Sequence, residues 1–148
     1  MSLDPEMERS EVSSTVYAYF NAGKEKEFAA MAKLHASSHL FTKFDENPPY
    51  SRQGSEEAFV HEQAMFANIS DYSYSIDDLR VDLLGGVAVS TFYLTYNGIF
   101  VNDYLFEGSP VGSKVRATMV LIKTKEGWKI AHQHFSRFPE LRISKSGS

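Results

Sequence analysis

The feature that most constrains the fold of this chain is a run of alternating apolar and polar side chains on both sides of Gly85 and Gly86. Residues 77–96 read DDLRVDLLGGVAVSTFYLTY. A period of two is typical of a strand with one buried face, and Gly-Gly is a common two-residue hairpin turn. The pattern therefore predicts two antiparallel strands in which Leu84 pairs with Val87. One face is then shared by Leu79, Val81, Leu83, Ala88, Ser90, Phe92 and Leu94.

A second hairpin pattern occupies the C-terminal part of the chain, which reads VRATMVLIKTKEGWKIAHQHF. Its Lys-Glu-Gly segment suits a three-residue loop with Gly127 in the left-handed conformation, which would pair Thr124 with Trp128. Strict alternation from that pair predicts a buried face that carries Ala117, Met119, Leu121, Ala131, Gln133 and Phe135. It assigns the opposite face to Arg116, Thr118, Val120, Ile122, Trp128, Ile130, His132 and His134.

This opposite face is too apolar to be left in water, because it combines Trp128 and Ile130 with other aliphatic side chains. A second copy of the chain is the simplest cover, so we expect a homodimer that forms through this face. His132 and His134 point the same way, a spacing that metal sites use, but no third ligand is evident beside them. We therefore expect a pair of interface histidines and no metal site.

The N-terminal part of the chain has helical periodicity. Apolar residues between Arg9 and His35 predict two helices joined at Gly23, and Ser55 with two acids after it predicts a third helix that runs to about Asn68. A short strand before the Pro-Pro pair connects the second helix to the third. Three helices followed by hairpins predict an α+β fold, with the helices packed on one face of a strongly curved, mostly antiparallel sheet.

Composition limits the classes of function. A chain of 148 residues with 43% hydrophobic content has the size of one globular domain, so we expect a single domain over residues 1–148 with an ordered core from about residue 8 to residue 140. The formal net charge of -4 offers no electrostatic footprint for nucleic acid or an anionic membrane. The sequence contains no cysteine, which favours a cytoplasmic location. It contains no long apolar run, so we expect no membrane-spanning helix. It also lacks a nucleotide-binding Gly-rich fingerprint, and we expect no cofactor.

Two local patterns stand out, RATMVLIKTKEGWKIAHQHFS near the C-terminus and FDENPPYSRQGSEEAF before the third helix. Both resemble the SnoaL-like branch of the nuclear-transport-factor-like superfamily. The first is also similar to the association domain of calcium/calmodulin-dependent kinases. The resemblance implies a cystatin-like cone with a pocket between the concave face of the sheet and the helices, and two subunits packed through their convex faces. This fold hosts isomerases, dehydratases, hydrolases, transport factors and oligomerisation modules, so the resemblance leaves function open.

Three residues are candidates for chemistry. Asp45 matches the position of the catalytic base in the ketosteroid isomerases of this superfamily when Gly54 is aligned, and the resemblance therefore implies a general base. Tyr17 lines up with the family's oxyanion-hole tyrosine if one residue is skipped. His61 lies on the flank of the apolar face of the third helix, from which it could reach the mouth of the cavity.

The resemblance and the density of aromatic residues predict a pocket for a small, flat, apolar or aromatic ligand. The side chains expected to line it are Tyr17, Phe20, Phe44, Tyr50, His61, Phe66, Phe92, Met119, Gln133 and Phe135. Three functions remain open: a homodimeric protein that binds a small molecule, a cofactor-independent isomerase, dehydratase or hydrolase with Asp45 as general base, and an oligomerisation module.

Overall fold

A computed structural model describes residues 4–102 and 107–139 of the chain. In chain order the elements are helix α1 (Pro5–Lys24), helix α2 (Phe28–Lys33), 3-10 helix η1 (Ser38–Leu40), strand β1 (Thr42–Phe44), helix α3 (Ser55–Asn68), and strands β2 (Ile69–Leu84), β3 (Val87–Asn102), β4 (Glu107–Thr124) and β5 (Gly127–Arg137). Among the helices of residues 4–102 and 107–139, none is both long enough and apolar enough to cross a membrane.

The helices begin where their sequences provide caps. The Asp4 side chain accepts the backbone N–H of Glu6 at 3.1 Å, and Pro5 occupies the first helical position, so α1 begins before Arg9. Its buried face carries Val12, Val16, Tyr19 and Phe20 at helical spacing. Helix α3 begins at Ser55 and ends at Asn68, as the sequence predicted.

Contrary to the prediction from the sequence, Gly23 does not end the first helix, and it has another role. It lies inside α1, and an added Cβ would meet the Phe66 ring of α3 at 2.6 Å. The chain leaves the helix at Glu25 and Lys26, and Lys26 has a positive φ of 57°. Gly23 therefore serves the close approach of α1 to α3, because no other residue type leaves room for the ring.

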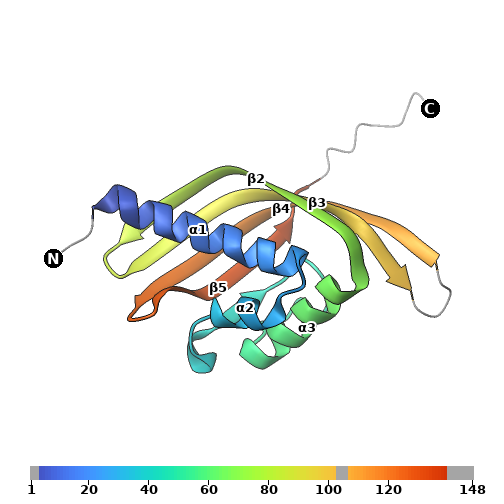
Figure 1. The fold of residues 1–148 in the computed structure, drawn as a ribbon, viewed down its shortest axis with the longest axis horizontal. Helices are drawn as coiled ribbons and strands as arrows, with labels where there is room; N and C mark the ends of the chain where they lie inside the picture. The colour runs from blue at the N-terminus through green and yellow to red at the C-terminus, as the bar shows by residue number, and fades with distance from the viewer. Residues whose placement is uncertain (1–3, 103–106, 140–148) are drawn as a thin grey trace.

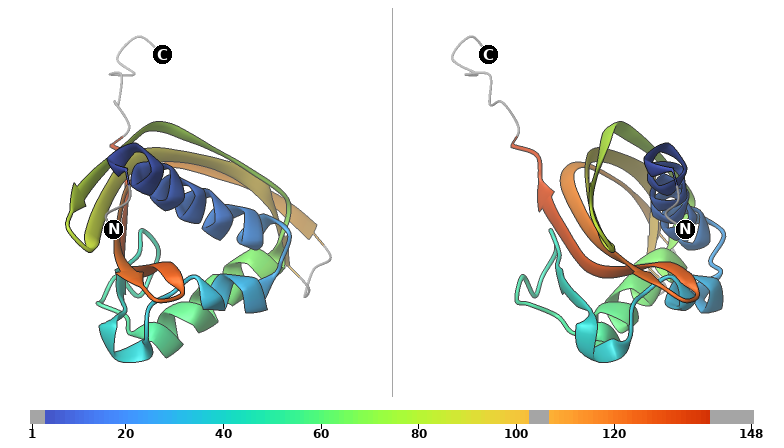
Figure 2. Two further views of the ribbon diagram at one scale, coloured as in Figure 1. Left: turned by 60° about the vertical axis from the view of Figure 1, so that its left-hand side comes forward. Right: turned by 90° about the vertical axis from the view of Figure 1, so that its left-hand side faces the viewer.

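The five strands form one curled sheet in the order β1-β5-β4-β3-β2. Only β1 and β5 run parallel within it, and the other neighbours are antiparallel. The sheet curls around α1, and α2 and α3 pack beside that helix at the open side of the curl (Figure 1, Figure 2). The β2–β3 hairpin has the predicted register from the turn to Arg80, with Leu84 opposite Val87. A β-bulge between Asp77 and Arg80 then shifts the register by one residue, so that Asp77 pairs with Tyr93. The α+β class with helices on the concave face is confirmed.

The register of the β4–β5 hairpin differs from the prediction. Thr124 pairs with Gly127 across a two-residue turn, so Lys123 is opposite Trp128. The register then shifts at a β-bulge, because Leu121 pairs with Ile130 whereas Val120 pairs with His132. The extra residue in β5 is Ala131, and it reverses the alternation of all β5 side chains that precede it.

The bulge moves two large side chains from one face of the sheet to the other. Trp128 is 5% exposed and Ile130 is fully buried, and both belong to the hydrophobic core on the concave face. The prediction that they lie on the convex face was wrong, because it assumed unbroken alternation through Ala131. The predicted convex residues that stay on that face are Arg116, Thr118, Val120, Ile122, His132 and His134.

Candidate functional site

The concave side of the sheet encloses a small cavity between α1, α3 and the segment that follows β1. Its volume is about 40 Å³, close to the roughly 30 Å³ that one water molecule occupies in the liquid. The cavity therefore has room for the tip of a ligand, and a whole aromatic ring fits only if lining side chains move. The lining residues are Tyr19, Phe20, Lys43, Asp45, Glu46, His61, Glu62, Met65, Phe66, Leu94, Tyr96, Val115 and Phe135.

A buried ion pair crosses the cavity wall. Lys43 on β1 and Glu62 on α3 are 4% and 3% exposed, and the Lys43 Nζ lies 2.9 Å from Glu62 Oε1. The same ammonium lies 5.1 Å from the centroid of the Phe135 ring, within range of a cation–π contact. Glu62 faces inward because it is one helical turn from both buried Ala58 and buried Phe66.

His35, which follows α2, approaches the other oxygen of the same carboxylate. Its Nε2 lies 3.7 Å from Glu62 Oε2, and its Nδ1 is 2.9 Å from the Met31 carbonyl oxygen, which fixes Nδ1 as a donor. Burial alone would raise the pKa of Glu62, but the Lys43 ammonium and the His35 imidazole outweigh it and hold that pKa at about 2. Glu62 is therefore a carboxylate at any pH near neutrality.

Two further buried polar groups lie near this carboxylate. Burial, and then the charge of Glu62, raise the pKa of Tyr19 well above its usual value, so the Tyr19 phenol stays protonated and can donate a hydrogen bond. Gln133 on β5 is fully buried, and neither atom of its amide has a hydrogen-bond partner within residues 4–102 and 107–139. Glu62 Oε2 likewise accepts no hydrogen bond in this part of the chain. Unsatisfied buried groups beside a cavity are suited to a ligand or an ordered water.

Two carboxylates lie at the mouth of the cavity, and they differ in how many hydrogen-bond and ion-pair partners they have. Glu46 accepts hydrogen bonds from the hydroxyls of Tyr96 at 2.9 Å and Ser113 at 3.0 Å, and Arg137 Nε lies 3.7 Å away. Asp45 is half-buried, and among the described residues its Oδ1 accepts a single hydrogen bond, from the backbone N–H of Glu46 at 2.8 Å. It forms no ion pair within the part of the chain that the structure describes. Glu46 is thus fixed in place, whereas Asp45 keeps acceptor capacity for a ligand.

His61 lies at the mouth on α3, where its side chain is exposed to solvent. Its Nδ1 is 2.9 Å from Gln53 Oε1, on a glutamine that is 1% exposed. With the amide oxygen as acceptor, Nδ1 carries the proton and Nε2 keeps a lone pair. This arrangement leaves the imidazole able to accept a proton or a hydrogen bond through Nε2.

The structure brings only some of the sequence-predicted residues to the cavity. Asp45 and His61 line it together with Phe20, Phe66 and Phe135. The side chains of Phe92, Met119 and Gln133 are buried in the neighbouring core and do not line it.

Three predicted pocket residues lie elsewhere. Tyr17 is 40% exposed on the outer face of α1, since helical periodicity turns Val16, Tyr19 and Phe20 inward. Tyr50 is 63% exposed. The Phe44 ring packs on His132 and His134 at 6.0 and 5.5 Å between ring centroids, on the other side of the sheet. The prediction that these three side chains line the pocket was therefore wrong.

Sequence reasoning missed the groups that define the base of the cavity: Tyr19, Lys43 and Glu62. One signal was available for Glu62, because it is an acid on the apolar stripe of an amphipathic helix, at i+4 from Ala58 and i−4 from Phe66. No comparable pattern marks Lys43, whose burial depends on the closure of the sheet by β1.

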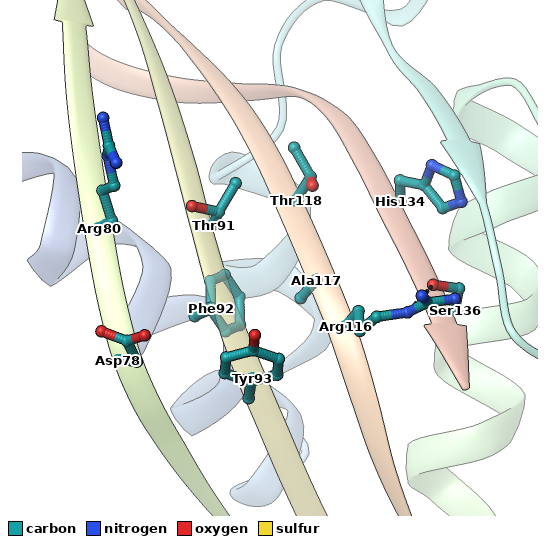
Figure 3. Close-up of a pocket in the computed structure, with 10 residues that line it drawn as sticks. All are labelled: Asp78, Arg80, Thr91, Phe92, Tyr93, Arg116, Ala117, Thr118, His134 and Ser136. Atoms are coloured by element: carbon teal, nitrogen blue, oxygen red, sulfur yellow. Dashed lines mark hydrogen bonds between the residues drawn. The ribbon is translucent and has the colours of Figure 1, made fainter. Parts of the chain in front are cut away.

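The convex face carries a larger but open groove of about 480 Å³ (Figure 3). Arg80, Thr91, Thr118 and His134 reach it from four neighbouring strands, and Arg116 Nε donates to Ser136 Oγ at 3.2 Å. No charged side chain that lines this groove is buried, so the groove lacks the desolvated groups that concentrate binding energy and chemistry. We therefore place the candidate site in the smaller cone cavity.

His132 and His134 were also considered as metal ligands because they point the same way. Among residues 4–102 and 107–139, no group of three or more His, Cys, Asp or Glu side chains could hold a metal ion. His132 instead shares a hydrogen bond with Thr42 through Nδ1 and Oγ1, 2.8 Å apart. Burial, and then the neighbouring His134, lower the pKa of His132.

Comparisons with known proteins agree with this architecture. A model of the SnoaL-like domain matches residues 12–140. Among curated protein sequences there is no match.

Solved structures resemble the fold at low sequence identity. A proposed dehydratase of the NTF2-like family from Streptomyces avermitilis is 19% identical, with a TM-score of 0.79 over 93% of this chain and 100% of that one. A proposed aromatic ring hydroxylase from Novosphingobium aromaticivorans is 18% identical, with a TM-score of 0.78 over 93% of this chain and 94% of that one. A proposed calcium/calmodulin-dependent protein kinase II association domain from Xanthomonas campestris is 19% identical, with a TM-score of 0.71 over 88% of each chain. At these identities the likeness shows the fold alone.

Proposed function

Because the chain belongs to the SnoaL-like family, we propose that it binds a small, mainly apolar or aromatic molecule whose polar end enters the cone cavity. The observation that carries the proposal is a set of buried polar groups with unused hydrogen-bonding capacity beside an internal cavity with aromatic walls. Glu62 Oε2 lines the cavity and is such a group, the Gln133 amide lies behind it in the neighbouring core, and Phe20, Phe66 and Phe135 supply the walls.

The cavity volume restricts how such a ligand is held. About 40 Å³ accommodates a hydroxyl, carbonyl or amino group and not a ring. The apolar remainder of the ligand therefore lies at the mouth, against Met65 and His61, or displaces them. Both residues lie on α3, and their partial exposure allows rotamer changes at small cost.

A steric block at the mouth tests this binding mode. We expect Met65→Trp to reduce the binding of small aromatic alcohols, amines and acids, detected by saturation-transfer NMR, because the indole would cover the entrance. Val60→Trp adds a similar volume to the same helix at a position that is 62% exposed, and it should leave binding unchanged. Equal binding by both variants and the unmodified protein would refute the cone as the binding site.

Acid–base catalysis is the second candidate function, since Asp45, His61 and Tyr19 line one cavity. In such a reaction the Asp45 carboxylate takes a proton from a carbon beside a carbonyl, and the C–H electron pair forms the C=C bond of an enolate. The carbonyl oxygen, which gains the negative charge, accepts a hydrogen bond from the buried Tyr19 phenol or from the Lys43 ammonium. Tyr19 takes the role that the sequence suggested for Tyr17.

Proton exchange provides the test of catalysis. Incubation of the protein with cyclohexanone in D₂O should speed deuterium incorporation beside the carbonyl, measured by NMR. Asp45→Asn should lower that rate about 100-fold or more, in the range of general-base contributions. The matched control Asp77→Asn removes the same charge from an exposed position on β2 and should have no effect. Exchange no faster than in buffer, or unaffected by Asp45→Asn, would remove Asp45 as a base.

We also propose that the chain forms a homodimer through the convex face of the sheet. Val120 and the neighbouring Val89 and Ile122 are only half-buried there, and the family resemblance favours this arrangement. The support is weaker than the sequence suggested, because Trp128 and Ile130 lie in the core. A protein that is dimeric but has no ligand would fit the third possibility, an oligomerisation module.

A further inference from the structure

The charges around the cone cavity are unbalanced. Three carboxylates line the cavity, those of Asp45, Glu46 and Glu62, against one ammonium, that of Lys43. Lys43 is paired with Glu62 at 2.9 Å, and Arg137 lies 3.7 Å from Glu46. Asp45 alone has no cationic partner within residues 4–102 and 107–139. The negative charge that has no nearby counter-charge is therefore that of Asp45, at the mouth.

A second observation concerns the buried carboxylate of Glu62, whose Oε2 has His35 Nε2 at 3.7 Å, beyond hydrogen-bond distance. Glu62 has a side chain that is 2% exposed, and its Oε2 accepts no hydrogen bond from the described part of the chain. A buried carboxylate oxygen with free lone pairs is stabilised by an N–H or O–H group that enters the cavity. An incoming carboxylate would instead face like charges in a poorly solvated space.

The walls of the cavity favour a positive charge as well. Phe20, Phe66, Tyr96 and Phe135 line it, and aromatic faces attract cations. The protein already holds one ammonium in this way, since Lys43 Nζ lies 5.1 Å from the centroid of the Phe135 ring. Because Glu62 neutralises Lys43, that lysine does little to repel a second cation at the mouth.

We propose that the cavity selects organic amines in their ammonium form, with the charged group between Asp45 and Glu62 and the apolar part at the mouth, against Met65 and His61. This inference rests on the proposed function, because it names the ligand class of the same cavity. It excludes carboxylates as ligands. It also predicts that alcohols bind more weakly than amines and more tightly than carboxylates, since an alcohol donates a hydrogen bond without bringing a charge.

The test compares three probes that share a ring and differ in charge: benzylamine, benzyl alcohol and benzoate. Their dissociation constants would be measured by NMR titration at neutral pH and low ionic strength. We expect benzylamine to bind about tenfold or more tightly than benzyl alcohol, which corresponds to one well-placed charge interaction that is partly screened. Benzoate should not bind detectably at millimolar concentrations.

Two variants assign the preference to Asp45. Asp45→Asn keeps the size of the side chain and the acceptor for the Glu46 N–H, and it should cut the preference for benzylamine about tenfold while benzyl alcohol binds as before. Asp77→Asn changes the net charge equally at an exposed site and should leave the preference unchanged. Thermal unfolding of both variants would check that each is folded.

The possible outcomes distinguish a failure of the amine inference from a failure of the proposed function, ligand binding in the cone. If benzyl alcohol binds as tightly as benzylamine, or benzoate binds most tightly, the amine inference is overturned and binding in the cone stands. If Asp77→Asn reduces the preference as much as Asp45→Asn, the effect is one of overall charge and the inference is overturned. If none of the three probes binds at millimolar concentrations, both the inference and the proposed function are overturned.

Discussion

At the scale of single residues, the Lys43–Glu62 pair dominates the energetics of the site. Two charges that are less than 5% exposed lose most of their hydration, and their attraction at 2.9 Å offsets that loss only while both are present. The pair contributes little to net stability by comparison with apolar residues of the same size, but it makes each partner dependent on the other. Such a pair also fixes a donor and an acceptor in the wall of the cavity.

The pair can be tested by a double-mutant cycle. We expect Lys43→Met to lower the free energy of unfolding by about 3–5 kcal/mol, because it leaves the Glu62 charge buried and unpaired. The double variant Lys43→Met, Glu62→Leu should recover most of that loss. Urea unfolding monitored by circular dichroism gives both values. A single variant that is as stable as the double one would mean that the two side chains are not coupled.

The lowered pKa of Glu62 predicts how the stability of the protein depends on pH. The pKa of Glu62 is about 2, against an ordinary value of 4.5. A carboxyl group whose pKa is lowered by folding stabilises the folded state above its ordinary pKa, and this contribution disappears as pH falls toward the folded value. We expect the unfolding free energy to fall by about 3 kcal/mol from this group as pH drops from 4.5 to 2.

Two variants isolate the contribution of Glu62 to this acid sensitivity. Glu62→Gln should lack that part of the pH dependence, and Glu57→Gln, at an exposed site on the same helix, should keep it. Urea titrations at several pH values would measure the slopes. A Glu62→Gln slope that matches that of the unmodified protein would show that other acids cause the loss of stability.

At the scale of secondary structure elements, the bulge at Ala131 decides which side of β5 enters the core. It places Trp128 and Ile130 on the same face as Gln133 and Phe135, which strict alternation would not allow. Deletion of Ala131 should therefore force either Trp128 or Phe135 out of the core. Trp128 is the only tryptophan of the chain, so its fluorescence reports the change.

We expect the Ala131 deletion to destabilise the protein by more than about 4 kcal/mol, because two or more large side chains lose their buried positions. The tryptophan emission should shift to the red as the indole becomes hydrated. Ala131→Gly keeps the residue count and should keep the blue-shifted emission. A deletion variant with unchanged emission and stability would show that the strand tolerates either register.

The contact between α1 and α3 supplies another prediction at this scale. Gly23→Ala should lower the unfolding free energy by about 1–3 kcal/mol, because the new methyl group would meet the Phe66 ring at 2.6 Å. Adding Phe66→Leu should reduce that penalty, since the smaller side chain makes room. Gly86→Ala, where an added Cβ meets nothing within 4 Å, is the control and should cost less. Equal losses in Gly23→Ala and Gly86→Ala would contradict the packing argument.

At the scale of the whole molecule, the curled sheet has one face filled by helices and one face open. The open face carries Arg80, Arg116 and His134 beside half-buried aliphatic side chains. If the proposed dimer forms there, Val120→Glu should convert the unmodified dimer into a monomer in light-scattering measurements of mass, because it buries a charge at the interface. Val60→Glu on α3 is the matched control. A dimer that survives Val120→Glu would place the interface elsewhere.

The sequence by itself determined the α+β class, the family and the order of the main helices and hairpins, although not all of their bounds. Gly85-Gly86 and the period of two were local signals, and they predicted the β2–β3 register correctly between the turn and the bulge that precedes Arg80, as Ser55 and its acids predicted α3. Asp45, identified through the family resemblance, and His61, identified through its position on the third helix, do line one cavity, whereas Tyr17 does not.

Only the tertiary structure decided which side chains share the cavity and how its charges are balanced. The bulge at Ala131 leaves no mark in the hydrophobic pattern, because Trp128 and Ile130 are apolar in either register. Lys43 and Glu62 are 19 residues apart, and they are brought together by the parallel pairing of β1 with β5, a contact between distant segments. Periodicity reports which way a side chain points within its own element, whereas burial of a charge depends on the partner that another element supplies.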